Sequence, residues 1–164
     1  MTKAWRALVF ALLFALSAIG PASAQQDIAG VASVIDGDTI EIRGQRIRLF
    51  GIDAPESSQL CVRPNGERWR CGQQSSFALA DRIGRATVRC EPRDIDRYRR
   101  IVAVCFKGTE DLDRWMVANG WAVAYRRYSL DYVADEDAAR RNRLNIWSGD
   151  SDMPWDWRAQ RRNY

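Results

Sequence analysis

The sequence predicts an α+β domain that is mainly β, a small closed barrel of five strands with three helices outside it. Several short segments alternate apolar and polar residues with the period of β-strands. Three others carry apolar residues at helical spacing, and the elements follow one another in the order βββαββαα. One domain with a hydrophobic core suits a chain of this length.

Residues 1–24 are predicted to be a secretory signal peptide and not part of the fold. Lys3 and Arg6 form a basic start, residues 7–19 are an apolar run, and Ala22-Ser23-Ala24 has the form of a cleavage site. The run is shorter than the roughly 20 residues of a comfortable membrane span. An uncleaved N-terminal anchor is the alternative. We expect cleavage, no stable membrane association afterwards, and a location in the periplasm or the medium.

The first three strands are predicted at residues 28–36, 39–43 and 45–52, with turns at Asp36-Gly37 and at Gly44. Their alternation places one set of side chains in a common core: Val34, Ile40, Ile42, Ile47 and Leu49. Residues 53–70 are polar and rich in Ser, Arg and Pro, so we expect a long loop there.

A helix is expected at residues 72–84, where Phe77, Ala80 and Ile83 have helical spacing, and a hairpin of residues 86–90 and 101–105 follows.

Thr109-Glu110-Asp111 is typical of a helix start, and Asn119-Gly120 of its end, with Leu112, Trp115 and Met116 between them as an apolar stripe. Residues 121–125 are predicted to be extended and residues 133–145 to form the third helix. We expect the domain to cover residues 25–147, and residues 148–164, with Trp155 and Trp157, to be a tail packed on it.

The net charge of the mature chain is small. Signal cleavage removes two of the 25 basic residues and none of the 21 acidic residues, which leaves +2. So small a charge argues against a protein that holds nucleic acid by bulk electrostatic attraction.

The four cysteines, Cys61, Cys71, Cys90 and Cys105, are predicted to form disulfides. There is no His and no Cys-x-x-Cys pair, which argues against a zinc site. An even number of cysteines in an exported chain favours disulfides. Cys90 and Cys105 end the two strands of the hairpin, and Cys61 and Cys71 bracket the polar loop. We therefore predict the pairs Cys61–Cys71 and Cys90–Cys105.

Three carboxylates, Asp38, Asp53 and Glu56, lie close together in the sequence with Arg48 between them. Brought together without compensation, they would repel one another. A hard divalent cation such as Ca²⁺ takes carboxylate and carbonyl oxygens and removes that repulsion. An Arg beside such a cation indicates an anionic substrate, most simply a phosphate. The alternative is that Asp36 and Asp38 are merely turn residues beside Gly37.

Five motifs occur in the order expected of a known family: Val34-Ile35-Asp36-Gly37-Asp38-Thr39, Ile47-Arg48-Leu49, Asp53-Ala54-Pro55-Glu56, Asp96-Arg97-Tyr98-Arg99-Arg100 and Leu144-Asn145-Ile146-Trp147. From about residue 31 to residue 147 the chain thus resembles the staphylococcal nuclease (thermonuclease) family. The resemblance implies an OB-fold barrel with three helices. It also implies a Ca²⁺-dependent phosphodiesterase that cleaves DNA and RNA at the 5′-oxygen and leaves 3′-phosphate ends.

By the same resemblance, Asp38 and Asp53 are the carboxylate ligands of Ca²⁺. Ala54 stands where the family usually has Thr, and it would supply the same backbone carbonyl oxygen. Glu56 would orient or deprotonate the attacking water.

Arg48 and Arg100 would clamp the scissile phosphate, since fixed donors stabilise the charge that gathers on it in the transition state.

Three further residues match substrate-contacting positions of the family. Arg97 and Tyr98 match the position that binds a flanking phosphate, and Tyr125 matches an aromatic residue that contacts the nucleotide. Solvated residues at a hairpin end and packing of Tyr125 are the alternatives. Arg99 replaces the usual Gly, which often serves a turn with positive φ, so Arg99 could tilt Arg100.

These observations predict a secreted, disulfide-bonded, Ca²⁺-dependent nuclease that acts as a monomer on DNA and RNA, preferably single-stranded. Two alternatives remain. One is a catalytically inactive OB-fold module that binds oligonucleotides or a protein. The other is an accessory factor in envelope or exopolysaccharide assembly.

Overall fold

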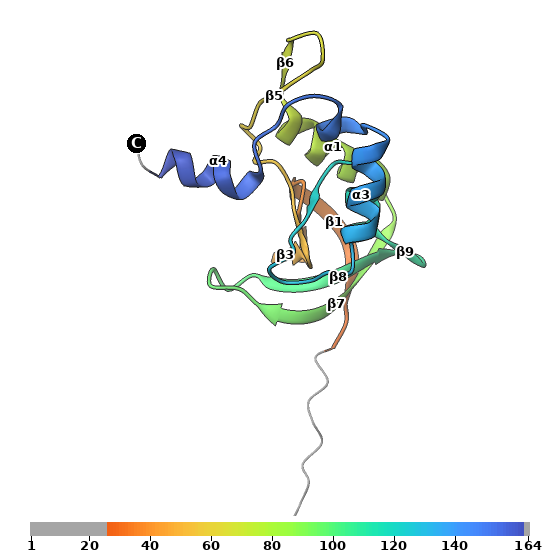
Figure 1. The fold of residues 1–164 in the computed structure, drawn as a ribbon. Helices are drawn as coiled ribbons and strands as arrows, with labels where there is room; N and C mark the ends of the chain where they lie inside the picture. Colours follow the sequence, from red (N-terminus) through yellow and green to blue (C-terminus); the bar gives the residue numbers. More distant parts are fainter. Residues whose placement is uncertain (1–25, 163–164) are drawn as a thin grey trace, which may run out of the picture.

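The computed structural model describes residues 26–162, and the predicted signal peptide lies outside them. Their main feature is a sheet with strand order β3-β2-β1-β7-β8-β9, which a parallel pairing of β3 with β8 closes into a barrel of five strands (Figure 1). The strands are β1 (Ile28–Asp36), β2 (Thr39–Ile42), β3 (Gln45–Leu49), β7 (Thr87–Ile95), β8 (Ile101–Lys107) and the short β9 (Glu110–Asp111). The predicted barrel is confirmed.

Two short strand pairs lie outside this sheet. β4 (Ile52–Asp53) pairs with β10 (Val123–Ala124), inside the segment predicted to be extended. β5 (Cys61–Val62) pairs with β6 (Arg68–Trp69), so the predicted long loop contains a small hairpin, which projects at the top of Figure 1.

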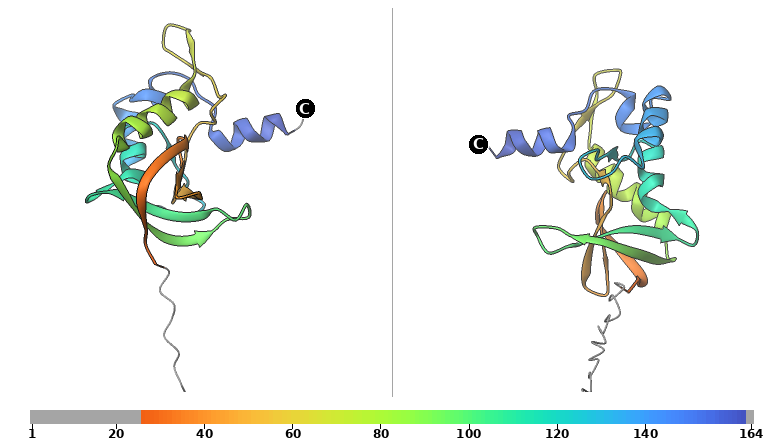
Figure 2. Two further views of the ribbon diagram at one scale, coloured as in Figure 1. Left: turned by 180° about the vertical axis from the view of Figure 1, so that it is seen from behind. Right: turned by 60° about the horizontal axis from the view of Figure 1, so that its bottom comes forward.

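Residues 26–162 contain four α-helices where three were predicted. α1 (Cys71–Ile83), α2 (Leu112–Ala118) and α3 (Val133–Arg141) are the expected ones, and a 3₁₀ turn η1 (Asn145–Ser148) follows α3. The additional helix, α4 (Pro154–Arg161), lies in the predicted tail and projects away from α1 and α3 (Figures 1 and 2). Pro154 occupies its first turn, where the missing N–H of a proline costs nothing. No helix of residues 26–162 is long and apolar enough to cross a membrane.

The barrel core contains the side chains that the strand alternation predicts. Ile40, Ile42, Ile47 and Leu49 are fully buried, and Val34 is partly buried against them. α1 and α2 close the core with four further apolar side chains: Leu79, Ile83, Leu112 and Met116.

The buried face of α1 differs from the predicted one. Of the three predicted residues, Ile83 is buried as expected, Ala80 is partly buried and Phe77 is 51% exposed. The other buried residues of the helix are Cys71, Gly72, Ser75 and Leu79. The physical reason is the close approach of α1 to the turn that carries Glu56. A Cβ on Gly72 would lie 1.7 Å from the carbonyl oxygen of Glu56, so only small residues fit on this part of the helix.

Both predicted disulfides are present and no cysteine is free. Cys90 and Cys105 face each other in the register of β7 and β8 and are fully buried in the barrel core. Cys61 and Cys71 join β5 to the start of α1 in a second apolar cluster, which Val123 and Ile146 complete.

Candidate active site

Arg48 joins two of the predicted carboxylates. It lies on β3 opposite Thr39 of β2, and its side chain is only 17% exposed. Its Nη1 donates to Asp38 Oδ1 at 2.9 Å, and its Nη2 donates to Asp53 Oδ1 at 2.8 Å. Asp38 lies in the β1–β2 turn and Asp53 ends β4, so this turn, β3 and β4 place the three charges together.

The turn before β2 explains why Asp38 points inward. Asp36 Oδ1 accepts a hydrogen bond from the backbone N–H of Asp38 at 3.0 Å, as a turn-forming Asp does. Asp38 Oδ2 accepts from the backbone N–H of Ala54 at 3.0 Å, and its Oδ1 accepts from Thr39 Oγ1 at 3.0 Å. Asp36 is therefore the turn residue, whereas Asp38 belongs to the charged cluster.

Burial and the neighbouring charges shift the pKa values of residues in and beside this cluster. Burial, and then the nearby charge of Asp38, raise the pKa of Asp36 to about 7. Burial also raises the pKa of Asp53, against the opposing effects of Arg158 and Arg48. For Arg48, burial alone would lower the pKa, but Asp38 and Asp53 raise it above its ordinary value. The site is thus a group of buried like charges held together by guanidinium groups.

The β7–β8 turn places Arg100 at the same cluster. Asp96 Oδ2 accepts from Arg100 Nε at 2.8 Å, and Arg100 Nη1 reaches Thr39 Oγ1 at 3.3 Å. Burial tends to raise the pKa of Asp96, but hydrogen bonds from Arg100 lower it below its ordinary value. Thr39 thereby connects Arg100 to Asp38, and Asp96 is a positioning residue without a role assigned from the sequence.

Arg99 adopts the left-handed conformation that a Gly in this place would adopt, with φ of 63°. The backbone N–H groups of Arg99 and Arg100 both bond to Asp96, at 2.9 Å in each case. The turn is therefore retained, and Arg99 does not turn Arg100 away from Thr39.

We expect Arg99→Gly to stabilise the protein by about 1 kcal/mol, because Gly has no Cβ to strain in this conformation. Any phosphodiesterase activity should change less than about twofold, since Arg100 is already oriented. Urea denaturation measures the first effect and initial cleavage rates the second. Arg97→Gly, in the same turn but without positive φ, is the control and should not stabilise. A large gain in rate for Arg99→Gly would show that Arg99 restrains Arg100.

The three predicted substrate-contacting residues lie at the margins of the cluster. Tyr98 is 65% exposed at the hairpin end, and the guanidinium groups of Arg97 and Arg100 lie over its ring at 4.8 and 5.5 Å from the centroid. Tyr125 stacks on Trp155 of α4, with centroids 5.5 Å apart and planes 13° from parallel. In this structure Tyr125 therefore packs against Trp155, which agrees with the packing alternative stated for this residue.

Arg158 of α4 is the main site residue that the sequence did not reveal. Its Nη2 donates to Asp53 Oδ2 at 2.7 Å, and its Nη1 donates to Asp53 Oδ1 at 3.1 Å and to Glu56 Oε1 at 2.7 Å. Glu56 thus joins the cluster through Arg158. No local pattern signals this contact, because more than 100 residues separate the partners.

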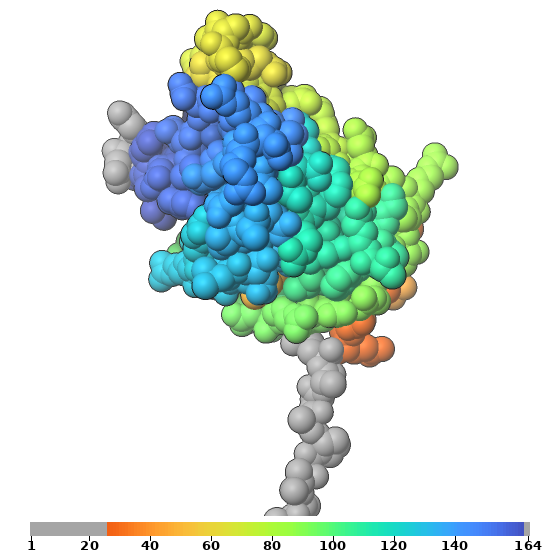
Figure 3. Space-filling model, turned by 45° about the vertical axis from the view of Figure 1, so that its right-hand side comes forward, coloured from red at the N-terminus to blue at the C-terminus, as the bar shows by residue number. Residues whose placement is uncertain are grey.

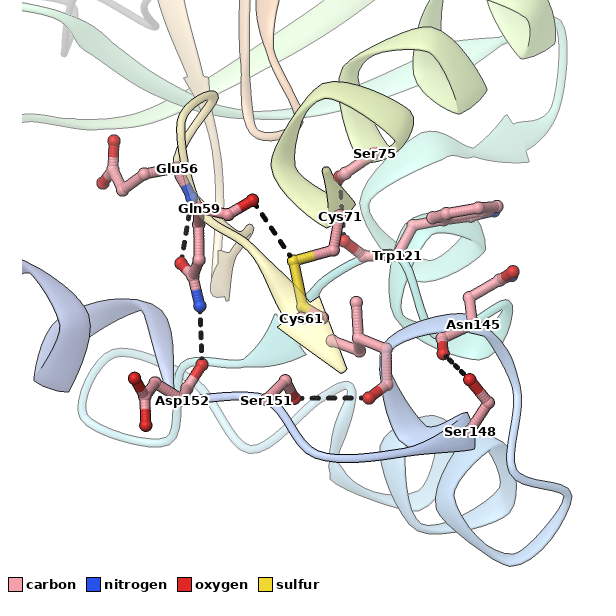
Figure 4. The surroundings of a disulfide bond; sticks show 11 residues. Glu56, Gln59, Cys61, Cys71, Ser75, Trp121, Asn145, Ser148, Ser151 and Asp152 are labelled. Atoms are coloured by element: carbon pink, nitrogen blue, oxygen red, sulfur yellow. Dashed lines mark hydrogen bonds between the residues drawn. A yellow bond between two sulfur atoms is a disulfide. The ribbon is translucent and has the colours of Figure 1, made fainter. Parts of the chain in front are cut away.

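Gln59 ties the turn of Glu56 to the segment that precedes α4 (Figure 4). Its Oε1 accepts from the backbone N–H of Glu56 at 3.2 Å, and its Nε2 donates to the carbonyl oxygen of Asp152 at 2.8 Å. Gln59 is fully buried, directly before the Cys61–Cys71 disulfide.

The donor chemistry of the site fits a hard cation. Asp38, Asp53 and the carbonyl of Ala54 offer oxygen ligands of the kind that Ca²⁺ takes. Among residues 26–162, however, no three acidic or Cys side chains are arranged to hold a metal as they lie. Arg48 and Arg158 take the oxygens of Asp53 instead, so a cation would need Arg158 to leave.

Comparison with known proteins identifies the family. The family model described as staphylococcal nuclease homologue matches residues 46–149. The chain is 40% identical over 140 residues to the succinoglycan biosynthesis protein ExoI of Rhizobium meliloti, covering 84% of this chain and 73% of that protein. It is 33% identical over 151 residues to a micrococcal nuclease of Shigella flexneri, covering 81% of each. An uncharacterized endonuclease of Haemophilus influenzae is 29% identical over 163 residues, covering 94% of this chain and 86% of that protein. The chain belongs to the staphylococcal nuclease homologue family.

Proposed function

We propose that the protein is a secreted, Ca²⁺-dependent nuclease that hydrolyses phosphodiester bonds of DNA and RNA to 3′-phosphate products. The observation that carries this proposal is the continuous network from Arg100 through Thr39, Asp38, Arg48 and Asp53. A barrel has no structural need for so many buried charges in one place, whereas phosphodiester hydrolysis needs fixed cations around an anionic centre.

Each residue has a role that its position supports. Arg48 and Arg100 donate to the non-bridging oxygens of the scissile phosphate, where negative charge develops. The bonds described above use only part of the five N–H donors of each guanidinium, so donors remain for a phosphate. Glu56, whose side chain is 36% exposed, accepts a proton from the water whose oxygen bonds to phosphorus. The bond between phosphorus and the 5′-oxygen breaks, and the leaving 5′-oxygen takes a proton from solvent.

Asp38, Asp53 and the Ala54 carbonyl would hold the Ca²⁺. The cation would supply Lewis-acid stabilisation of the phosphate charge. Arg97 and Tyr98 lie where a flanking phosphate of a single-stranded substrate would pass, and Tyr125 would stack on a base. The two disulfides support export to an oxidising compartment. We further propose that the mature protein acts as a monomer.

Cleavage of single-stranded DNA by the oxidised mature protein, with Ca²⁺ or with excess EDTA, tests the proposal. We expect EDTA to abolish cleavage, and Glu56→Ala and Arg100→Ala each to lower the rate by about 10²-fold or more, because each removes a group aimed at the transition state. Arg93→Ala is the control, since Arg93 is exposed and pairs only with Glu91 in the described chain. Wild-type cleavage no faster than that of the two site variants would refute the enzyme and favour an oligonucleotide-binding module.

A second candidate is a role in exopolysaccharide assembly, and the similarity to the succinoglycan biosynthesis protein favours it. To separate this role from the nuclease function, the gene is deleted and complemented with the wild type or with Glu56→Ala. Complementation of polysaccharide production by Glu56→Ala would assign the protein a role that does not depend on phosphodiester cleavage.

A further inference from the structure

The contacts of α4 reach two separate parts of the proposed active site. Arg158 forms a bidentate ion pair with Asp53 and a further bond with Glu56. Trp155, one turn earlier, stacks on Tyr125. Residues three apart lie on one helix face, so a single face of α4 covers both positions.

Arg158 uses the oxygens that the cation would need. It bonds both oxygens of Asp53, a side chain that is completely buried while α4 is docked. With Arg158 in place, two guanidinium groups face the three carboxylates of Asp38, Asp53 and Glu56. Without it, Arg48 alone faces them, and the excess of two negative charges suits a divalent cation.

Trp155 covers the face of Tyr125 on which a nucleotide base would stack. The two rings are nearly parallel, at 13°, which is the geometry in which a nucleotide base stacks on an aromatic side chain. A base cannot use the same face of Tyr125 while Trp155 lies on it.

The helix is anchored at its start, and beyond Pro154 its contacts with the proposed site are the side-chain contacts of Trp155 and Arg158. Val62 and Asp150 exchange backbone hydrogen bonds of 2.8 and 2.9 Å, and Gln59 binds the carbonyl of Asp152. Figure 4 shows the bond between Gln59 and Asp152 near the Cys61–Cys71 disulfide. Within α4 itself only Pro154 is buried.

Beyond its anchor, α4 lies at the edge of the molecule (Figure 3). A hollow of about 340 Å³ is lined by residues 124–127, by Glu136 and Arg140 of α3, and by Met153 and Trp155. The barrel core contains no side chain of α4, so the helix can leave without disturbing that core.

We propose that α4 is an intramolecular inhibitor of the proposed active site, in which Arg158 occupies the cation position on Asp53 and Trp155 the base position on Tyr125. Binding of Ca²⁺ or of a nucleic-acid strand then displaces the helix about its disulfide-anchored base. This inference rests on the proposed function, because it assumes that Asp53 binds the cation and Tyr125 a base.

Calcium titration calorimetry of the full mature chain tests the first contact. We expect Arg158→Ala to bind Ca²⁺ about tenfold more tightly, as it would if α4 is docked about 90% of the time in the wild type. Arg161→Ala removes the same charge from an exposed position of the same helix, so it controls for long-range electrostatics and should change the affinity less than twofold. Hydrogen exchange at residues 154–161 of the wild type should become faster on addition of Ca²⁺.

Binding of a labelled oligothymidylate in EDTA, which removes cleavage, tests the second contact. Trp155→Ala should bind severalfold more tightly than the wild type, and Trp157→Ala, whose ring lies instead under Arg161, should not.

The possible failures are distinguishable. Equal Ca²⁺ affinity of wild type and Arg158→Ala, with unchanged exchange in α4, would overturn the inhibitor and leave the nuclease standing. Weaker Ca²⁺ binding by Arg158→Ala, or weaker oligonucleotide binding by Trp155→Ala, would make α4 part of the binding surface and also overturn it. Absence of Ca²⁺ binding in every variant would refute the cation site itself. It would also refute the replacement of Arg158 by a cation on Asp53.

Discussion

Arg48→Ala should lower the cleavage rate by about 10³-fold and the free energy of unfolding by about 3 kcal/mol. The rate falls because a donor to the phosphate is lost and because Asp38 and Asp53 lose the group that holds them together. The stability falls because two buried carboxylates are left with less compensation, which is the costly way to break a buried ion pair. Single-turnover cleavage of an oligonucleotide and urea denaturation measure the two effects.

Two further variants separate charge from geometry in this prediction. Arg48→Lys keeps the charge but cannot bridge two carboxylates as a planar fork does, so it should regain part of the stability and little of the rate. Arg82→Ala removes an Arg whose ion pair with Glu110 lies at the surface, and it should change neither quantity much. Cleavage by Arg48→Ala within about threefold of the wild type would contradict the phosphate-clamp role.

The barrel could be predicted from the sequence because its strands show their periodicity locally. Ile40, Ile42, Ile47 and Leu49 alternate with polar residues, and all four are buried as expected. The turn at Asp36-Gly37 likewise carries its own signal, since Asp36 bonds the backbone two residues later.

The buried face of α1 could not be predicted in the same way, because periodicity analysis looks for large apolar side chains. Here Gly72 packs closely against the turn of Glu56, Ser75 packs against Gly37, and Phe77 is exposed. Small residues at a close approach leave no hydrophobic signal.

Some residues of the site could be predicted from the sequence and one could not. Asp38, Arg48, Asp53 and Arg100 lie in short motifs with fixed spacing, and the structure brings them together. Arg158 lies in no motif, and it meets Asp53 and Glu56 only in the folded chain. A tertiary ion pair of this kind is invisible to local patterns, so the proposed regulation of the site emerges only from the structure.

The two disulfides should contribute similarly to the stability of the protein but differently to its activity. The chain-entropy model assigns about 3 kcal/mol to the Cys90–Cys105 bond and slightly less to Cys61–Cys71, because the sequence separations are 15 and 10 residues. Replacing either pair by Ala should therefore lower the urea midpoint by a similar amount.

Only loss of Cys61–Cys71 should also lower kcat/KM, by about tenfold or more, at temperatures where both variants are folded. This bond fixes the loop that carries Glu56 and Gln59, and a displaced base loses rate steeply. The Cys90–Cys105 bond lies inside the barrel core and not in the loop that carries Glu56, so its loss should leave kcat/KM nearly unchanged. Equal activity of the two folded variants would show that the position of Glu56 does not depend on the disulfide. Loss of activity in the Cys90 and Cys105 variant alone would place the sensitive geometry in the β7–β8 hairpin that carries Arg100.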